Sequence, residues 1–236
     1  MAKFKGNIRK KTEKQLIIKF ISIFNACAIK KKKLNQRMSF VLTGGPSPVN
    51  LYKSLSNSKI DWSNIDFFWG DERCVDHKSK NSNYNLVKKH LLNKIKINIK
   101  NIYSINTKNK NVNWSALNYE KVIKKYFDNK KKSFDIILLG MGPDGHIASI
   151  FEDQMYLKTN RVISPVIQKD FKRITINLKI INKAKNIFLW LNNKKITKIF
   201  KKIIKNKNVP VSNLKKKFYN FIFDKLIFIR KLFDGN

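Results

Sequence analysis

The stretch that decides the fold is FDIILLGMGPDGH, residues 134–146. Residues 134–139 are apolar apart from Asp135, which predicts a buried strand. Three glycines follow within six residues, at positions 140, 142 and 145, and predict a tight loop at the carboxyl end of that strand. In open α/β sheets ligands bind at this end of the strands, so the loop is a candidate binding site.

Working outward, strand-like runs and helical patterns alternate along the chain. Apolar runs cover 38–42, 65–69, 162–167, 173–178 and 186–191, and helical spacing covers 16–29, 49–55, 83–92, 114–127 and 194–204. This alternation predicts an α/β fold with a mainly parallel sheet covered by helices. The segment after Pro210 fits either a strand or a helix. Because no repeat or linker interrupts the pattern, we expect one domain over residues 1–236.

The charge of the chain is high. Its 236 residues carry 51 Lys and Arg against 15 Asp and Glu, a formal charge of +36, which makes a nucleic-acid-binding protein the first alternative. Only six of the 51 cations are Arg, the residue that suits base and phosphate recognition best, and the lysines are spread along the whole chain. Clusters such as 30–33 are expected at solvated helix ends. We therefore expect no specific nucleic-acid partner.

Cysteine usage and hydropathy suggest the compartment. Cys27 and Cys74 are too few for a disulfide framework and do not form a Cys-x-x-Cys pair, which favours a reducing compartment. No apolar run is long enough to span a membrane. Residues 16–29 behind a basic start could serve as a signal peptide, but Lys19 interrupts them and their apolar spacing of three to four residues favours an amphipathic helix.

Three candidate loops follow predicted strands, at 44–48, 70–73 and 140–146. His146 is the candidate general base, because it lies in a glycine-rich turn beside the Asp144 carboxylate, which could orient it.

The spacing of glycines 140, 142 and 145 also matches a dinucleotide fingerprint, but Pro143 stiffens the turn and no acidic residue ends a following strand. The His and Cys spacing matches no zinc site, so a metal-free mechanism is expected.

Longer motifs resemble one family. Residues 65–73 (IDFFWGDER), 82–84 (SNY) and 138–146 (LLGMGPDGH) are similar to 6-phosphogluconolactonases, with support from 43–45 (TGG) and 173–175 (RIT). The resemblance extends loosely over nearly the whole chain. It implies a Rossmann-like three-layer sandwich and hydrolysis of 6-phosphoglucono-1,5-lactone to 6-phosphogluconate without a cofactor. We also expect a cytoplasmic monomer without a membrane partner.

The resemblance also implies roles for particular residues. His146 would be the general base, supported by Asp144. The substrate would contact the backbone of Gly44 and Gly45 and the side chains of Arg73, Arg173 and Lys195. Two of these assignments have alternatives, because Arg73 could instead pair with Asp71 or Glu72, and Lys194 is adjacent to Lys195.

The sequence departs from the family pattern at two places. Residues 44–48 read GGPSP where the family more usually has Ser or Arg and then Thr after the glycines, and Ile147 replaces a frequent Thr. Ile147-Ala148 also resembles the related glucosamine-6-phosphate deaminases. Those enzymes continue with Phe-Asn-Glu-Pro and carry Asp-Glu-Tyr earlier, whereas this chain has Ser149-Ile150-Phe151 and Asp71-Glu72-Arg73, which favours the lactonase.

Overall fold

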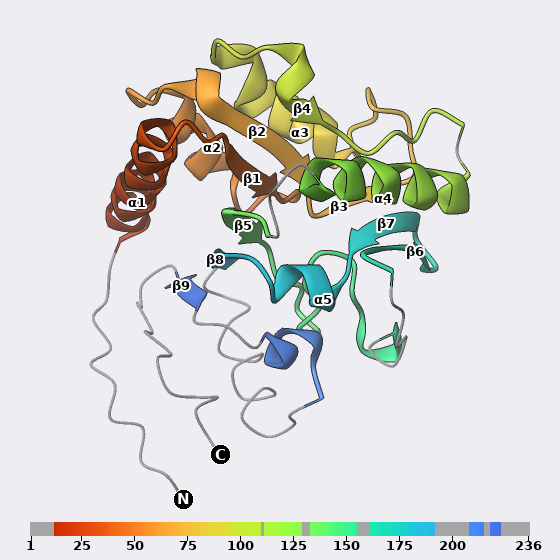
Figure 1. The fold of residues 1–236 in the computed structure, drawn as a ribbon. Coiled ribbons are helices and arrows are strands. Elements are labelled where there is room, and N and C mark those ends of the chain that lie inside the picture. Colours follow the sequence, from red (N-terminus) through yellow and green to blue (C-terminus); the bar gives the residue numbers. More distant parts are fainter. Residues whose placement is uncertain are drawn as a thin grey trace, which may run out of the picture.

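The computed structural model describes residues 12–109, 111–128, 133–154, 161–191, 208–214 and 218–222 (Figure 1). Its helices are α1 (Glu13–Lys33), α2 (Val49–Ser56), α3 (Asn83–His90), α4 (Val112–Asp128) and α5 (Leu178–Ile181). Its strands are β1 (Met38–Leu42), β2 (Ile65–Trp69), β3 (Asp71–Arg73), β4 (Ile102–Tyr103), β5 (Ile136–Leu139), β6 (Ile163–Ile167), β7 (Lys172–Ile176), β8 (Asn186–Leu191) and β9 (Phe218–Ile222).

Six strands form the main sheet, in the order β4-β2-β1-β5-β8-β9, and every pairing in it is parallel. The chain adds strands on one side of β1 as far as β4, then crosses back and continues from β5 on the other side. The strand order therefore reverses between β1 and β5. Every residue of β1, β2 and β5 is buried, including Ser39 and Asp66, which interrupt the apolar runs of β1 and β2. The expected mainly parallel α/β fold is confirmed.

Helices cover both faces of this sheet. Phe68 of β2 is in register with Val41 of β1, so it projects from the face opposite to Phe40. The ring of Phe24 in α1 lies 4.9 Å from that of Phe40, and the ring of Tyr126 in α4 lies 4.7 Å from that of Phe68, centroid to centroid. Helices α1 and α4 therefore pack on opposite faces, which gives the predicted three layers (Figure 1).

A second, antiparallel sheet was not expected. Strands β3, β7 and β6 pair in that order, so the two predicted strands at 162–167 and 173–178 lie outside the parallel sheet, and the second ends at Ile176. Residues 71–73 were expected in a loop and instead form β3. This strand pairs with β7 and places Arg73 opposite Arg173. The local sequence did not reveal this pairing because its partners lie about a hundred residues apart.

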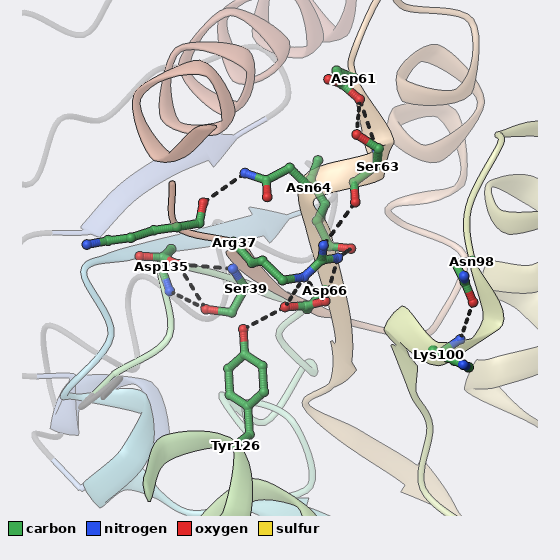
Figure 2. Close-up of polar contacts among 12 residues, drawn as sticks. Arg37, Ser39, Asp61, Ser63, Asn64, Asp66, Asn98, Lys100, Tyr126 and Asp135 are labelled. Carbon is green, nitrogen blue, oxygen red and sulfur yellow. Dashed lines mark hydrogen bonds and ion pairs between the residues drawn. The ribbon is translucent and has the colours of Figure 1, made fainter. Parts of the chain in front are cut away.

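Buried charges lie at the other end of the parallel strands, away from the candidate loops (Figure 2). The Arg37 side chain donates to Asp66 at 2.8 Å, and the Tyr126 hydroxyl donates to the same carboxylate at 2.9 Å. Asp135 accepts from the backbone N–H of Ser39 at 3.0 Å. It also forms ion pairs with Lys31 and Lys185, at 2.9 and 3.0 Å. Lys31 is 8% exposed, so the expectation of a fully solvated cluster at 30–33 is wrong for this residue.

Asp135→Asn is expected to lower the free energy of unfolding by about 2 kcal/mol at pH 7, because it removes charge-assisted hydrogen bonds and leaves Lys31 without its counter-charge. Burial acts to raise the pKa of Asp135, but its bonds to Lys31, Ser39 and Lys185 outweigh burial, so its pKa lies below the usual 3.8. As pH falls, the Asp135 carboxylate is therefore protonated in the unfolded chain before it is protonated in the folded protein. The stabilisation from the ionised carboxylate is lost as pH falls through its lower, folded-state pKa. Urea unfolding should show that the difference in free energy of unfolding between variant and wild type is smaller at acid pH than at pH 7. An equal difference at the two pH values would contradict this.

The remaining predictions have mixed outcomes. The segment after Pro210 contains strand β9, and β4 was missed because it has only two residues. The helix expected at 194–204 lies outside the described residues. Cys27 and Cys74 are free thiols. Among the described residues, no helix combines the length and the apolar character needed to cross a bilayer.

Candidate active site

A cavity of about 200 Å³ opens where the strand order reverses, at the carboxyl ends of β1 and β5. Its position follows the general rule for open α/β sheets, in which loops after strands on either side of the reversal diverge and leave a crevice. Most lining residues come from the three predicted loops, and others come from β7, from the start of α3 and from the end of β8. They include Thr43, Gly44, Gly45, Ser47, Asp71, Arg73, Asn83, Gly142, His146, Ala148, Arg173 and Leu191.

Glycines shape the loop that carries His146. A Cβ atom on Gly142 would lie 2.1 Å from Cε1 of His146 and 2.6 Å from Oδ1 of Asp144, so only a glycine leaves room for both side chains. Gly145 has a φ of +90° and packs its Cα against Val209, where a Cβ would approach the Val209 Cβ to 2.9 Å. The loop closes through the Gly142 N–H, which donates to the His146 carbonyl at 2.9 Å. The turn that the glycines predicted therefore holds the imidazole against the backbone.

Asp144 orients the imidazole. Nδ1 of His146 lies 2.6 Å from Oδ1 of Asp144, and the same oxygen accepts the His146 backbone N–H at 3.3 Å. Burial acts to raise the pKa of Asp144, but the bonds from His146 outweigh it and the pKa lies below its ordinary value. An ionised carboxylate only accepts hydrogen bonds, so the neutral imidazole carries its proton on Nδ1. Nε2 is then unprotonated and available as a base.

Arg73 is not neutralised by its acidic neighbours. Within the described residues no ion pair joins it to Asp71 or Glu72. Its Nη1 donates to the carbonyl of Asn81 at 2.8 Å, while its buried Nε has no partner there. Glu72 instead accepts from backbone N–H groups at the start of α3, including Asn83 at 2.7 Å. Burial raises the pKa of Glu72 to about 7, against the effect of these donors. The Arg73 guanidinium can therefore bind an anion in the cavity.

A buried polar cluster forms part of the cavity wall, and sequence analysis assigned it no role. The Asp71 carboxylate accepts from the Ser149 hydroxyl at 2.7 Å and from Nδ2 of Asn83 at 3.2 Å. The Ser149 backbone N–H donates to the Thr175 hydroxyl at 3.2 Å. Ala148, just before Ser149, has a φ of +50°, which is unusual for a residue with a Cβ. The cluster joins the His146 loop to β3 and β7. The sequence signal for it was that Asp71, Asn83 and Thr175 lie inside the recognised motifs.

The first glycine loop is fixed by two aromatic side chains. The Tyr52 hydroxyl donates to the Thr43 carbonyl at 2.7 Å, and the indole N–H of Trp190 donates to the Ser47 carbonyl at 3.1 Å. Gly45 has a φ of +79°, which favours glycine, so the chain turns sharply there. Pro46 has no N–H to donate. The backbone N–H groups of residues 44, 45 and 47 are therefore the loop's candidate donors to an anion.

Gly44→Ala is expected to destabilise the protein by about 1–3 kcal/mol, as overpacking of a closed site does. The new Cβ would lie 1.8 Å from Oδ1 of Asn83, which is only 2% exposed and is held by Asp71. Thermal unfolding should show a fall in Tm of about 2–4 °C per kcal/mol for a chain of this size. Gly140→Ala is the control, because its Cβ would meet only the Thr43 hydroxyl, at 3.5 Å. Equal shifts for the two variants would contradict the packing argument.

Arg173 reaches the same cavity from β7. Its side chain is 9% exposed, donates to Asp170, and lies over the rings of Phe151 and Phe171, with Cζ 5.6 and 5.8 Å from their centroids. The structure thus brings His146, Asp144, Arg73, Arg173, Gly44 and Gly45 together around one cavity. Lys195 and Lys194 lie outside the described residues. Within the described part of the chain, no cluster of His, Cys, Asp and Glu has the arrangement of a metal site.

Comparisons with known proteins agree with this geometry. Residues 11–222 match the family model for glucosamine-6-phosphate isomerases and 6-phosphogluconolactonase. The chain is 33% identical over 159 residues to a 6-phosphogluconolactonase of Nostoc sp., an alignment that spans 66% of each protein. It is 33% identical over 188 residues to a 6-phosphogluconolactonase of Haemophilus influenzae, covering 77% of this chain and 78% of the relative. The solved 6-phosphogluconolactonase from Trypanosoma cruzi superposes with a TM-score of 0.78 at 27% identity, covering 94% of this chain and 95% of that one.

Proposed function

Because the chain belongs to the family of glucosamine-6-phosphate isomerases and 6-phosphogluconolactonases, we propose that it hydrolyses 6-phosphoglucono-1,5-lactone to 6-phosphogluconate, with His146 as general base. The observation that carries this proposal is the His146–Asp144 pair beside Arg73 in one cavity. A base and an anion-binding group on the walls of a single cavity suit a substrate that has a reactive ester at one end and a phosphate at the other.

The reaction needs one proton transfer in each direction. Nε2 of His146 takes a proton from water as the water oxygen attacks the lactone carbonyl carbon, and the carbonyl oxygen becomes an oxyanion. As the tetrahedral intermediate collapses, the ring C–O bond breaks, and the imidazolium returns the proton to the departing ring oxygen. Asp144 stabilises the imidazolium while it exists. The acid product then releases its own proton to solvent, so His146 finishes the cycle neutral.

Substrate binding uses the other cavity residues. Arg73 holds the phosphate, because its guanidinium has a buried Nε without a partner among the described residues. The N–H groups at Gly44 and Gly45 contribute further donors at the same edge. Arg173 contributes positive charge to the same cavity, and Lys195 a further contact with the phosphate, as the family resemblance implies. No covalent intermediate is required, because water activated by His146 attacks the lactone carbonyl directly. The Ser149 hydroxyl donates to Asp71.

The test is a coupled assay that follows disappearance of the phosphorylated lactone with the purified protein, with glucosamine-6-phosphate as the rival substrate. We expect lactone hydrolysis well above the uncatalysed rate and no turnover of the amino sugar. The opposite preference would assign the chain to the other branch of the family, and turnover of neither would reject both. A cytoplasmic location, a monomeric state, a single domain and the absence of a specific nucleic-acid partner stay predictions.

A further inference from the structure

The His146 imidazole has a second neighbour besides Asp144. The ring of Phe151 lies 4.5 Å from the imidazole, centroid to centroid, with the two planes inclined by 40°. Phe151 is half-buried and follows the His146 loop directly. At this separation the two rings are in van der Waals contact, so rotation of the imidazole toward Phe151 is blocked.

Phe151 is in turn held from β7. The Arg173 guanidinium lies 5.6 Å from its ring centroid, within the range of a cation–π contact. Arg173 is largely buried, forms an ion pair with Asp170 and also lies over the Phe171 ring. The contacts therefore run from Asp170 through Arg173 and Phe151 to His146. An aromatic ring held in this way restricts rotation of the imidazole, because the ring cannot move away without breaking its contact with the guanidinium.

The bond to Asp144 alone does not fix the imidazole. The side chain of Asp144 is 49% exposed and that of His146 is 24% exposed, so water competes for both partners. Exposed pairs of this kind contribute little on their own. A general base nevertheless has to keep one nitrogen aimed at the attacking water, because small displacements of a catalytic group are costly.

We propose that Phe151 is a positioning residue of lactone hydrolysis: its ring, held by Arg173, keeps the imidazole turned so that Nδ1 stays on Asp144 and Nε2 faces the cavity. The kinetic consequence rests on the function proposed above. The restraint on the ring does not, because it is a property of the folded protein and can be measured without substrate.

The experiment compares Phe151→Leu and Phe151→Ala with the wild type, by steady-state kinetics and by NMR of the histidine rings. The chain has only three histidines, so the His146 ring nitrogens can be assigned with His146→Gln as reference. In the wild type we expect the Nδ1–H tautomer to predominate. In Phe151→Ala we expect a mixture of tautomers and a fall in kcat of roughly 10- to 100-fold, with KM within about twofold. Phe151→Leu keeps most of the volume and should show a smaller change in the same direction.

Phe171→Leu is the matched control, because Phe171 also lies under Arg173, at 5.8 Å, but no contact joins it to His146. It should leave kcat and the tautomer unchanged. A wild-type tautomer and kcat in both Phe151 variants would overturn the proposal, as would equal effects of the Phe171 and Phe151 variants. If Phe151→Ala does not fold, Phe151→Leu decides. If the wild type does not hydrolyse the lactone, the proposed function fails, and the tautomer measurement still decides the positioning role.

Discussion

His146→Ala is expected to leave a folded protein whose kcat for lactone hydrolysis falls by roughly 10²–10⁴-fold, the usual contribution of a positioned general base. Nε2 is the free nitrogen of the ring whose Nδ1 lies 2.6 Å from Asp144, so its removal leaves the attacking water without a proton acceptor. The His146 side chain is 24% exposed and is not part of the hydrophobic core cluster, so the fold should survive. Stopped assays with fresh lactone, corrected for spontaneous hydrolysis, measure the effect.

The control for this variant is His90→Ala. His90 ends α3 and does not line the cavity, so its loss should leave kcat unchanged. KM of His146→Ala should stay close to that of the wild type, because the phosphate contacts are intact. A variant without the imidazole that kept most of its activity would remove His146 from the mechanism.

Arg73→Ala is expected to lower kcat/KM for the phosphorylated lactone on the order of 150-fold, mainly through a higher KM. This corresponds to a loss of about 3 kcal/mol in transition-state stabilisation. The reason is that the half-buried Arg73 side chain lines the cavity and is the proposed partner of the phosphate. Hydrolysis of unphosphorylated gluconolactone should change little, because that substrate never made the contact. The ratio of the two kcat/KM values is therefore the measurement.

Lys53→Ala is the matched control for charge, since Lys53 is exposed on α2 and its loss also removes one positive charge. It should leave both substrates unaffected at moderate salt. Equal losses on the phosphorylated and unphosphorylated lactones for Arg73→Ala would show that Arg73 does not bind the phosphate. Equal losses for Arg73→Ala and Lys53→Ala would mean that the overall field of a chain with charge +36, and not a specific contact, attracts the substrate.

The sequence predicted most of the parallel sheet and the loop of His146, because these depend on local patterns. An uninterrupted apolar run such as 136–139 is expected in a strand that is buried on both faces. Glycines at 142 and 145 permit a turn that other residues cannot make. Asp144 lies two residues from His146, so their pairing was also readable from the chain. The same reasoning failed for 71–73, where a short polar strand has no apolar pattern to identify it.

Only the tertiary structure decided the contacts between distant segments of the chain. Asp71 bonds to Ser149, Arg173 lies over Phe151, and Lys31 is drawn into a buried ion pair with Asp135. Each contact joins residues that lie 22 to 104 positions apart, and the side chains involved would be ordinary surface residues in another fold. Periodicity and turn chemistry act over a few residues, whereas these partners are brought together by how helix α1 and the second sheet pack against the main sheet and its loops. The sequence therefore determined where the candidate catalytic loop lies and which groups it carries, and the packing determined which neighbours hold those groups in place.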